Sequence, residues 1–164
     1  MEKTVEYLQE AFAGESQANR RYLAFAQKAE QEGYAQIARL FRAAAAAETV
    51  HAHNHLKVLK GVRSTTENLQ EAVDGETTEF REMYPRMIAA SQAEGNKEAE
   101  RTFNFANEVE KVHAALFQKA LKNQADKTMV DIYVCSICGY TVEGEAPDNC
   151  PVCKAVKKFF NRVD

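Results

Sequence analysis

The sequence contains no hydrophobic run long enough to cross a membrane and no dense block of basic residues. Its longest nearly apolar run, Ala43 to Ala47, is far shorter than the roughly 18 residues that a membrane-spanning helix requires. The 21 lysines and arginines face 24 aspartates and glutamates, for a net charge of -3, so no surface suited to nucleic acid is expected. Residues 1–6 carry charge where a signal peptide has its apolar core. We therefore expect a cytoplasmic protein that binds neither membranes nor nucleic acid.

Cysteine is absent from the first 125 residues and proline occurs there once, as Pro85. This part is rich in Ala, Glu, Gln, Lys, Arg and Leu, which is the composition of long helices. After Thr128 the chain turns to β-branched and aromatic residues, and all four cysteines lie between Cys135 and Cys153. The change in composition predicts a helical domain over residues 1–126 and a small separate module over residues 130–164.

The helical part has few residues that interrupt helices. They are Gly33, Gly61, Gly75 and Gly95. The segment Ser64–Glu67 has the pattern of a capping box, which starts a helix. These signals predict four long helices and a short one near Glu67–Ala72, carried on a crossover from Gly61 to Gly75. The expected fold class is mainly α, a four-helix bundle with a long crossover.

Each of the four long helices has apolar residues along one face, here called its seam. An acidic residue interrupts each seam near its middle. The seam acids are Glu15, Glu48, Glu76 and Glu110, and two of them begin Glu-x-x-His motifs that end at His51 and His113. Glu79 lies one turn beyond the acid of the third seam. Burying an ionised carboxylate without a partner costs several kcal/mol or more, and the seams offer no Lys or Arg at these depths. The acids must therefore be protonated, paired or bound to metal.

The seam residues match the ligand set of di-iron carboxylate bundles, in which two helices supply a Glu and two others supply Glu-x-x-His. Glu and His three residues apart lie on one helix face, where both reach one ion. A site rich in carboxylates favours iron or manganese over zinc, and the sequence does not choose between those two. A single such motif is usually a solvated helix face, but the joint pattern favours metal. We expect His53 on the surface, and the role of His55, one turn beyond His51, stays open.

The cysteines form two Cys-x-x-Cys knuckles separated by eleven residues. They are Cys135, Cys138, Cys150 and Cys153. Four thiolates can surround a structural zinc or a single iron, and spacing alone favours zinc. A pair of disulfides is the weaker interpretation in a cytoplasmic protein. The module is too small for a sufficient apolar core and is expected to need its metal to fold.

Both parts together resemble one family, the rubrerythrins, in which a ferritin-like di-iron bundle precedes a rubredoxin-like module. The resemblance rests on Gly14–Asn19 with Tyr22, Ala47–His51, Glu76–Glu79 with Glu82–Pro85, Glu110–His113, and the Cys-x-x-Cys-Gly-Tyr and Cys-Pro-x-Cys knuckles. It covers essentially the whole chain. The resemblance implies iron in the cysteine site, although zinc can substitute, and two irons in the carboxylate site.

The resemblance also implies roles for individual residues. Glu79 and His51 would exchange as ligands of one iron, with Glu79 holding the oxidised ion and His51 the reduced one. Glu48 and Glu110 would bridge or span the two irons. The remaining ligands would be Glu15, Glu76 and His113. Tyr22 and Tyr84 would donate hydrogen bonds to the carboxylates, unless they are ordinary seam aromatics.

The activity that the resemblance implies is that of a peroxidase in oxidative-stress defence, reducing hydrogen peroxide to water. The cysteine-bound iron would pass electrons singly from an external donor, a rubredoxin or an NAD(P)H-dependent reductase. In the family, electrons pass between subunits, which implies a homodimer. Two alternatives remain: a ferroxidase or iron-storage protein built on the same ligands, and a non-enzymatic regulator with a zinc ribbon.

Overall fold

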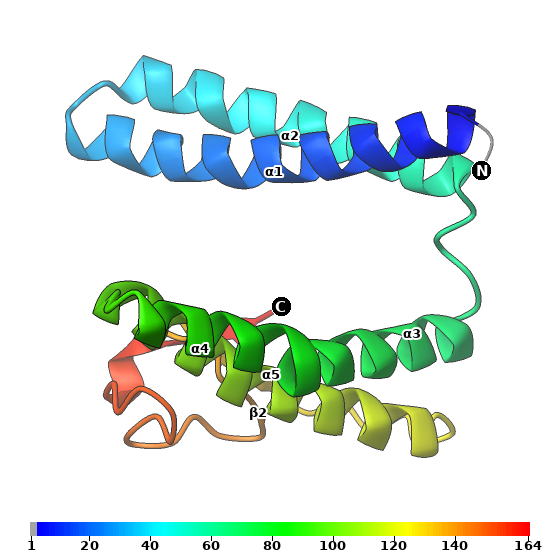
Figure 1. Cartoon of the computed structure of the whole chain (residues 1–164), viewed down its shortest axis with the longest axis vertical. Coiled ribbons are helices and arrows are strands. Elements are labelled where there is room, and N and C mark those ends of the chain that lie inside the picture. Colours follow the sequence, from blue (N-terminus) through cyan, green and yellow to red (C-terminus); the bar gives the residue numbers. More distant parts are fainter. Residues whose placement is uncertain (1–2) are drawn as a thin grey trace. The chain divides into compact units, whose positions relative to one another are not determined.

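The structure is a computed structural model that describes residues 3–164 and divides into two compact units (Figure 1). The first unit ends at Arg63 and the second begins at Ser64. The boundary expected between the helical domain and the cysteine module, at residues 126 to 130, falls within the second unit and stays a prediction.

The first unit is a helical hairpin. Its helices are α1 (Lys3–Gln31) and α2 (Ala35–Val58), shown in blue and cyan in Figure 1. The turn between them contains Gly33 at a φ of +83°, a backbone conformation that residues with a Cβ rarely adopt. The buried residues of the two helices are Ala26, Ala29, Ala38, Ala45 and Ala52. Because alanine is small, the two helices can approach each other closely.

Polar side chains fix the register of this hairpin. The Asn19 amide donates to the carbonyl oxygen of Ala45 at 2.7 Å and to Oγ1 of Thr49 at 2.8 Å. Nearer the turn, Arg42 pairs with Glu30 at 3.2 Å. The middle of α1 is therefore held opposite the middle of α2, where both helices carry their seam acids.

The second unit begins with three consecutive helical segments and a long helix that runs back beside them. The segments are α3 (Thr65–Thr78), η1 (Glu79–Met83) and α4 (Tyr84–Ala93), and the long helix is α5 (Lys97–Lys122). The predicted capping box is confirmed, with Ser64 and Glu67 bonded to each other's backbone N–H. Thr66 donates to Gln124 at 2.6 Å, so the start of α3 lies beside the end of α5.

The prediction of a short helix at Glu67–Ala72, ending before Gly75, was wrong. The helix that begins at Thr65 continues through Gly75 to Thr78. A glycine inside a helix costs only about 1 kcal/mol relative to alanine, which the surrounding helix can offset. The connection from α2 is confined to the residues between Val58 and Thr65.

A π-turn, which was not predicted, joins α3 to α4. In η1 the N–H of Tyr84 donates to the carbonyl oxygen of Glu79, five residues earlier. Pro85 follows directly, at the start of α4. Proline has no N–H to donate, and its ring would clash with the carbonyl four residues earlier in a regular α-helix. The wider turn gives that ring room, so Pro85 explains the position of η1.

The cysteine module is a small antiparallel sheet. Its strands are β1 (Ile132–Cys135), β2 (Thr141–Glu143) and β3 (Phe160–Val163), in the order β2-β1-β3, with a short 3₁₀ helix, η2 (Lys157–Phe159), before β3. Its buried core consists of Cys135, Ala146, Cys150 and Phe160. Two of these four residues are cysteines, in keeping with a module that needs its metal to fold.

The module packs on α5 within the second unit. A Cβ added to Gly139 would lie 3.7 Å from Cγ1 of Val109, which is 2% exposed. Further along α5, Lys119 forms an ion pair with Glu143. These contacts hold β2 against the part of α5 that carries Glu110 and His113.

Among residues 3–164, no helix combines the length and apolar character that crossing a membrane would require.

Candidate metal centres

The first unit gathers three of the predicted ligands into one cluster. Glu15 comes from α1, and Glu48 and His51 come from α2. Nδ1 of His51 lies 2.9 Å from Oε2 of Glu48 and 3.9 Å from Oε1 of Glu15. The candidate ligand atoms all lie within 4.8 Å of one another, which is close enough for a shared ion.

The second unit gathers three more predicted ligands in a matching cluster. Glu76 comes from α3, and Glu110 and His113 come from α5. Nδ1 of His113 lies 2.6 Å from Oε2 of Glu110 and 3.9 Å from Oε1 of Glu76. Each unit thus holds one Glu and one Glu-x-x-His motif in similar geometry.

The carboxylates of the second unit are crowded. Burial, followed by the charge of Glu110, raises the pKa of Glu76 to about 7 from an ordinary 4.5, although His113 acts in the opposite direction. Burial and the charge of Glu110 also raise the pKa of Glu79. Glu79 therefore lies within electrostatic reach of this cluster, but it is not among the ligand atoms that converge there, and its role as a ligand stays a prediction.

Both clusters fit metal ions. In each cluster, the carboxylates lie next to a histidine. The atoms that converge are carboxylate oxygens and imidazole nitrogens. Acceptors crowded in this way are stabilised when a proton or a metal ion lies between them. Carboxylate-rich sites of this kind suit hard divalent ions such as ferrous iron.

The crowding of Glu76 predicts how the stability of the metal-free protein depends on pH. Between about 4.5 and about 7 the folded chain holds a proton that the unfolded chain has released. The free energy of unfolding should therefore fall as pH rises through this window, by up to about 3 kcal/mol. Urea unfolding at about pH 5 and about pH 8 measures the change.

Glu76→Gln is the control for this pH effect, because the amide cannot titrate. Its free energy of unfolding should change less with pH than that of the unsubstituted protein. Equal pH dependence in the two proteins would contradict the assignment of the raised pKa to Glu76.

The π-turn brings Tyr84 to the acidic cluster. Eight residues of regular α-helix would leave Tyr84 about 80° away from the face of Glu76. A turn that takes up one extra residue reduces this offset to about 20°. Burial and the charges of Glu79, Glu110 and Glu76 raise the pKa of Tyr84, so the phenol lies within electrostatic reach of these carboxylates and keeps its proton.

The other candidate aromatic and histidine residues lie in different surroundings. Tyr22 packs in an aromatic cluster with Phe25 and Phe41, at centroid distances of 6.3 and 6.1 Å. His53 is exposed, as expected, and His55 is partly buried outside the ligand clusters found among the described residues. The roles of Tyr22 and His55 stay open.

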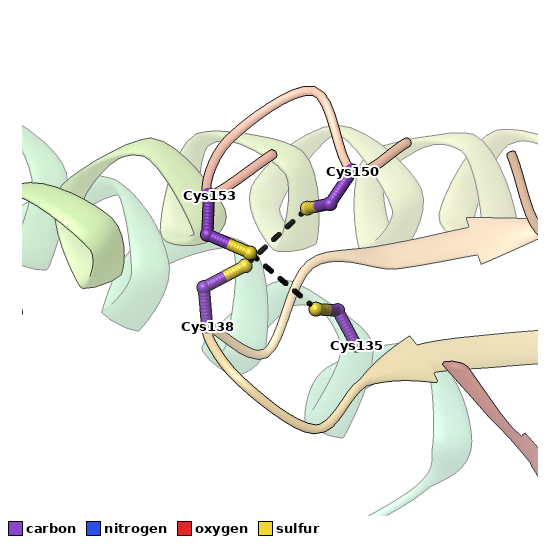
Figure 2. Close-up of side chains that lie close together, drawn as sticks. All are labelled: Cys135, Cys138, Cys150 and Cys153. Atoms are coloured by element: carbon purple, nitrogen blue, oxygen red, sulfur yellow. Dashed lines mark hydrogen bonds between the residues drawn. The ribbon is translucent and has the colours of Figure 1, made fainter. Parts of the chain in front are cut away.

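The four cysteines converge as predicted (Figure 2). Sγ of Cys135 lies 3.6 Å from Sγ of Cys153, and Sγ of Cys138 lies 3.5 Å from Sγ of Cys150. All four thiols are free, and these separations are well above the roughly 2.05 Å of a disulfide. Burial raises the pKa of Cys138, against a backbone hydrogen bond from Tyr140. A bound cation would favour the thiolate in this buried position.

Removal of metal from the cysteine site should unfold the module, because the cysteines form much of its core. Amide hydrogens of β1 should then exchange at the rate of an unstructured chain, whereas those in the middle of α1 should stay protected. Hydrogen exchange before and after treatment with a chelator measures both. Continued protection of β1 in the metal-free protein would show that the module folds without metal.

Comparisons with known proteins agree with these features. The family model described as Rubrerythrin matches residues 6–121, and the model described as Rubrerythrin, rubredoxin-like domain matches residues 133–161. The chain is 39% identical to Rubrerythrin-2 of Clostridium acetobutylicum, covering 96% of this chain and 95% of that protein. It is 37% identical to Nigerythrin of Nitratidesulfovibrio vulgaris, covering 96% of this chain and 85% of that protein. The solved structure "Fully reduced state of nigerythrin (all ferrous)" matches with a TM-score of 0.60 at 36% identity, over 98% of this chain and 86% of that one.

The comparisons confirm two predictions. The fold class is mainly α, ferritin-like, with a small rubredoxin-like module at the C-terminal end. The cofactors expected are a di-iron carboxylate site and a metal in a four-cysteine site. The assignment of individual ligands stays a prediction.

Proposed function

Because the chain belongs to the rubrerythrin family, we propose that it is a non-haem di-iron peroxidase that reduces hydrogen peroxide to water. The observation that carries this proposal is the pair of matching clusters, one Glu with one Glu-x-x-His in each unit. Together they offer four carboxylates and two imidazoles, the donor set of a di-iron site. We assign the six ligands to Glu15, Glu48, His51, Glu76, Glu110 and His113.

The reaction requires two electrons and two protons for each hydrogen peroxide, and it yields two waters. Two irons held by these ligands would supply the one-electron redox chemistry that cleaves the O–O bond. The protein holds the carboxylates in place and supplies hydrogen-bond donors near them. Tyr84 suits this task because its raised pKa keeps the phenol protonated beside Glu79 and Glu110.

We assign Glu79 and His51 to the ligand exchange that the family resemblance implies. Support for Glu79 comes from its electrostatic coupling to Glu110 and His113. Support for His51 comes from its place in the first cluster, where Nδ1 lies 2.9 Å from Oε2 of Glu48 and 3.9 Å from Oε1 of Glu15.

The cysteine site would hold an iron that carries one electron at a time. We propose that it accepts electrons from a rubredoxin or an NAD(P)H-dependent reductase, in a cytoplasmic homodimer that serves oxidative-stress defence. Support for iron over zinc comes from the match of residues 133–161 to a rubredoxin-like domain. Electron delivery gives this module a role that an iron-storage protein does not need.

A steady-state assay tests the proposal against its alternatives. The iron-loaded protein is supplied under anaerobic conditions with NADH, a rubredoxin reductase and rubredoxin, and NADH oxidation is followed after addition of hydrogen peroxide. One NADH should be consumed for each peroxide. Oxidation of added ferrous iron by the peroxide and its deposition in the protein as ferric iron, without NADH consumption, would favour a ferroxidase. A cysteine site that takes up only zinc would favour the regulator.

A further inference from the structure

We propose that Thr141 of the cysteine module is a positioning residue for His113, so that the module supports a ligand of the carboxylate cluster in its own unit. The inference rests on the proposed role of His113 as a metal ligand. Oγ1 of Thr141 lies 2.9 Å from Nε2 of His113. Metal-binding histidines generally donate their second ring N–H to a neighbouring acceptor, which fixes the tautomer and the direction of the ring.

The hydrogen bonds of Thr141 decide which histidine nitrogen carries the hydrogen. The Thr141 hydroxyl donates to the carbonyl oxygen of Gly139 at 3.0 Å. A hydroxyl has one hydrogen, so toward His113 the same oxygen can only accept. Nε2 of His113 must therefore carry a hydrogen, so a metal ion that replaces the hydrogen shared by Nδ1 and Oε2 of Glu110 finds the electron pair of Nδ1 available.

Nδ1 lies among the carboxylates. Nδ1 is the nitrogen 2.6 Å from Oε2 of Glu110 and 3.9 Å from Oε1 of Glu76. Thr141 thus selects the tautomer in which the histidine is ready to bind a metal ion from the nitrogen that faces the cluster.

The surrounding packing holds Thr141 in place. Gly139 fits against buried Val109 on one side of the contact, and Glu143 pairs with Lys119 on the other. These contacts lie before and after His113 along α5. The hydroxyl is therefore supported by a docked strand and not by a mobile loop.

The histidine of the first unit lacks an equivalent support within its own unit. Within residues 3–63, His51 contacts Glu48 and Glu15, both at Nδ1, and Nε2 has no acceptor there. Within the contacts of its own unit, His113 is therefore held at both nitrogens and His51 at one.

Nitrogen-15 NMR of the full chain tests the proposal, with Zn²⁺ as a diamagnetic probe in all sites. We expect the spectrum of His113 to show Zn²⁺ on Nδ1 and hydrogen on Nε2. Zn²⁺ bound through Nε2 would overturn the proposal in the unsubstituted protein, without any variant. The measurement does not depend on peroxide, so it can fail or succeed independently of the proposed peroxidase activity.

Two substitutions then measure the effect of the hydroxyl. Thr141→Val removes it with little change in shape, and we expect Zn²⁺ affinity at the carboxylate site to fall about 10- to 100-fold. Thr141→Ser restores the hydroxyl and should restore the affinity. A Co²⁺ spectrum of the cysteine site verifies that each variant module is folded.

Lys119→Met is the matched control, because it removes a docking contact of β2 and leaves Thr141 intact. It should keep both the affinity and the Nδ1 coordination. Equal losses in Thr141→Val and Lys119→Met, or no rescue by serine, would show that Thr141 acts through docking alone and would overturn the proposal.

Discussion

Zinc in place of iron in the four-cysteine site is expected to abolish steady-state peroxide turnover. Zinc has the same tetrahedral preference for thiolates, so the module should stay folded, but zinc cannot change its oxidation state. Peroxide should still oxidise the iron of the carboxylate site once, because the ligands of that site lie outside the cysteine knuckles. Steady-state NADH oxidation and a single mixing with peroxide measure the two steps separately.

The iron-loaded form of the same preparation is the control for the zinc experiment, because the two forms have identical sequences. It should show both the single oxidation and continued turnover. Undiminished turnover in the zinc form would show that the cysteine module has a structural or regulatory role, which is the interpretation that the knuckle spacing alone favoured.

Glu110→Ala is expected to remove the metal from the carboxylate site and with it the peroxidase activity. Glu110 is the carboxylate nearest to His113, at 2.6 Å, and its loss should weaken binding by more than the roughly 10- to 100-fold typical of a residue that only supports a ligand. The metal-free variant should not be less stable, because one of several crowded negative charges is gone. Metal analysis and thermal unfolding measure the two effects.

Two further substitutions, Glu79→Ala and Glu108→Ala, are compared with Glu110→Ala in the same measurements. Glu79→Ala should keep its metal and lower the turnover rate, because the six other proposed ligands remain. Glu108→Ala, on the same helix, removes a carboxylate that pairs with Lys111 and is 54% exposed, so it should change neither property. An unaltered peroxidase rate in Glu79→Ala would show that Glu79 takes no part in a ligand exchange.

The ligand clusters were predictable because they depend on the spacing of residues that are close together in the sequence. Glu-x-x-His places two ligands on one helix face whatever the rest of the fold does, as His51 and His113 show. The same holds for the cysteine knuckles, where a tight turn brings two sulfurs together. The capping box at Ser64 was predictable for the same reason, because it involves only four consecutive residues.

The features that were missed depend on the balance of energies or on contacts between distant residues. Gly75 weakens a helix without ending it, so its effect depends on the packing of α3 against α5. The π-turn had a signal in Pro85, but the sequence does not say whether a proline ends a helix or widens one turn. The contact of Thr141 with His113 joins residues 28 positions apart, and no spacing rule indicates it.

Rapid mixing of the fully reduced, iron-loaded protein with hydrogen peroxide tests the central claim most directly. Peroxide should oxidise the carboxylate-bound iron much faster than an equal concentration of oxygen does, with one peroxide consumed for each di-iron site. Faster oxidation by oxygen than by peroxide, followed by release or storage of ferric iron, would contradict the account and identify the protein as a ferroxidase.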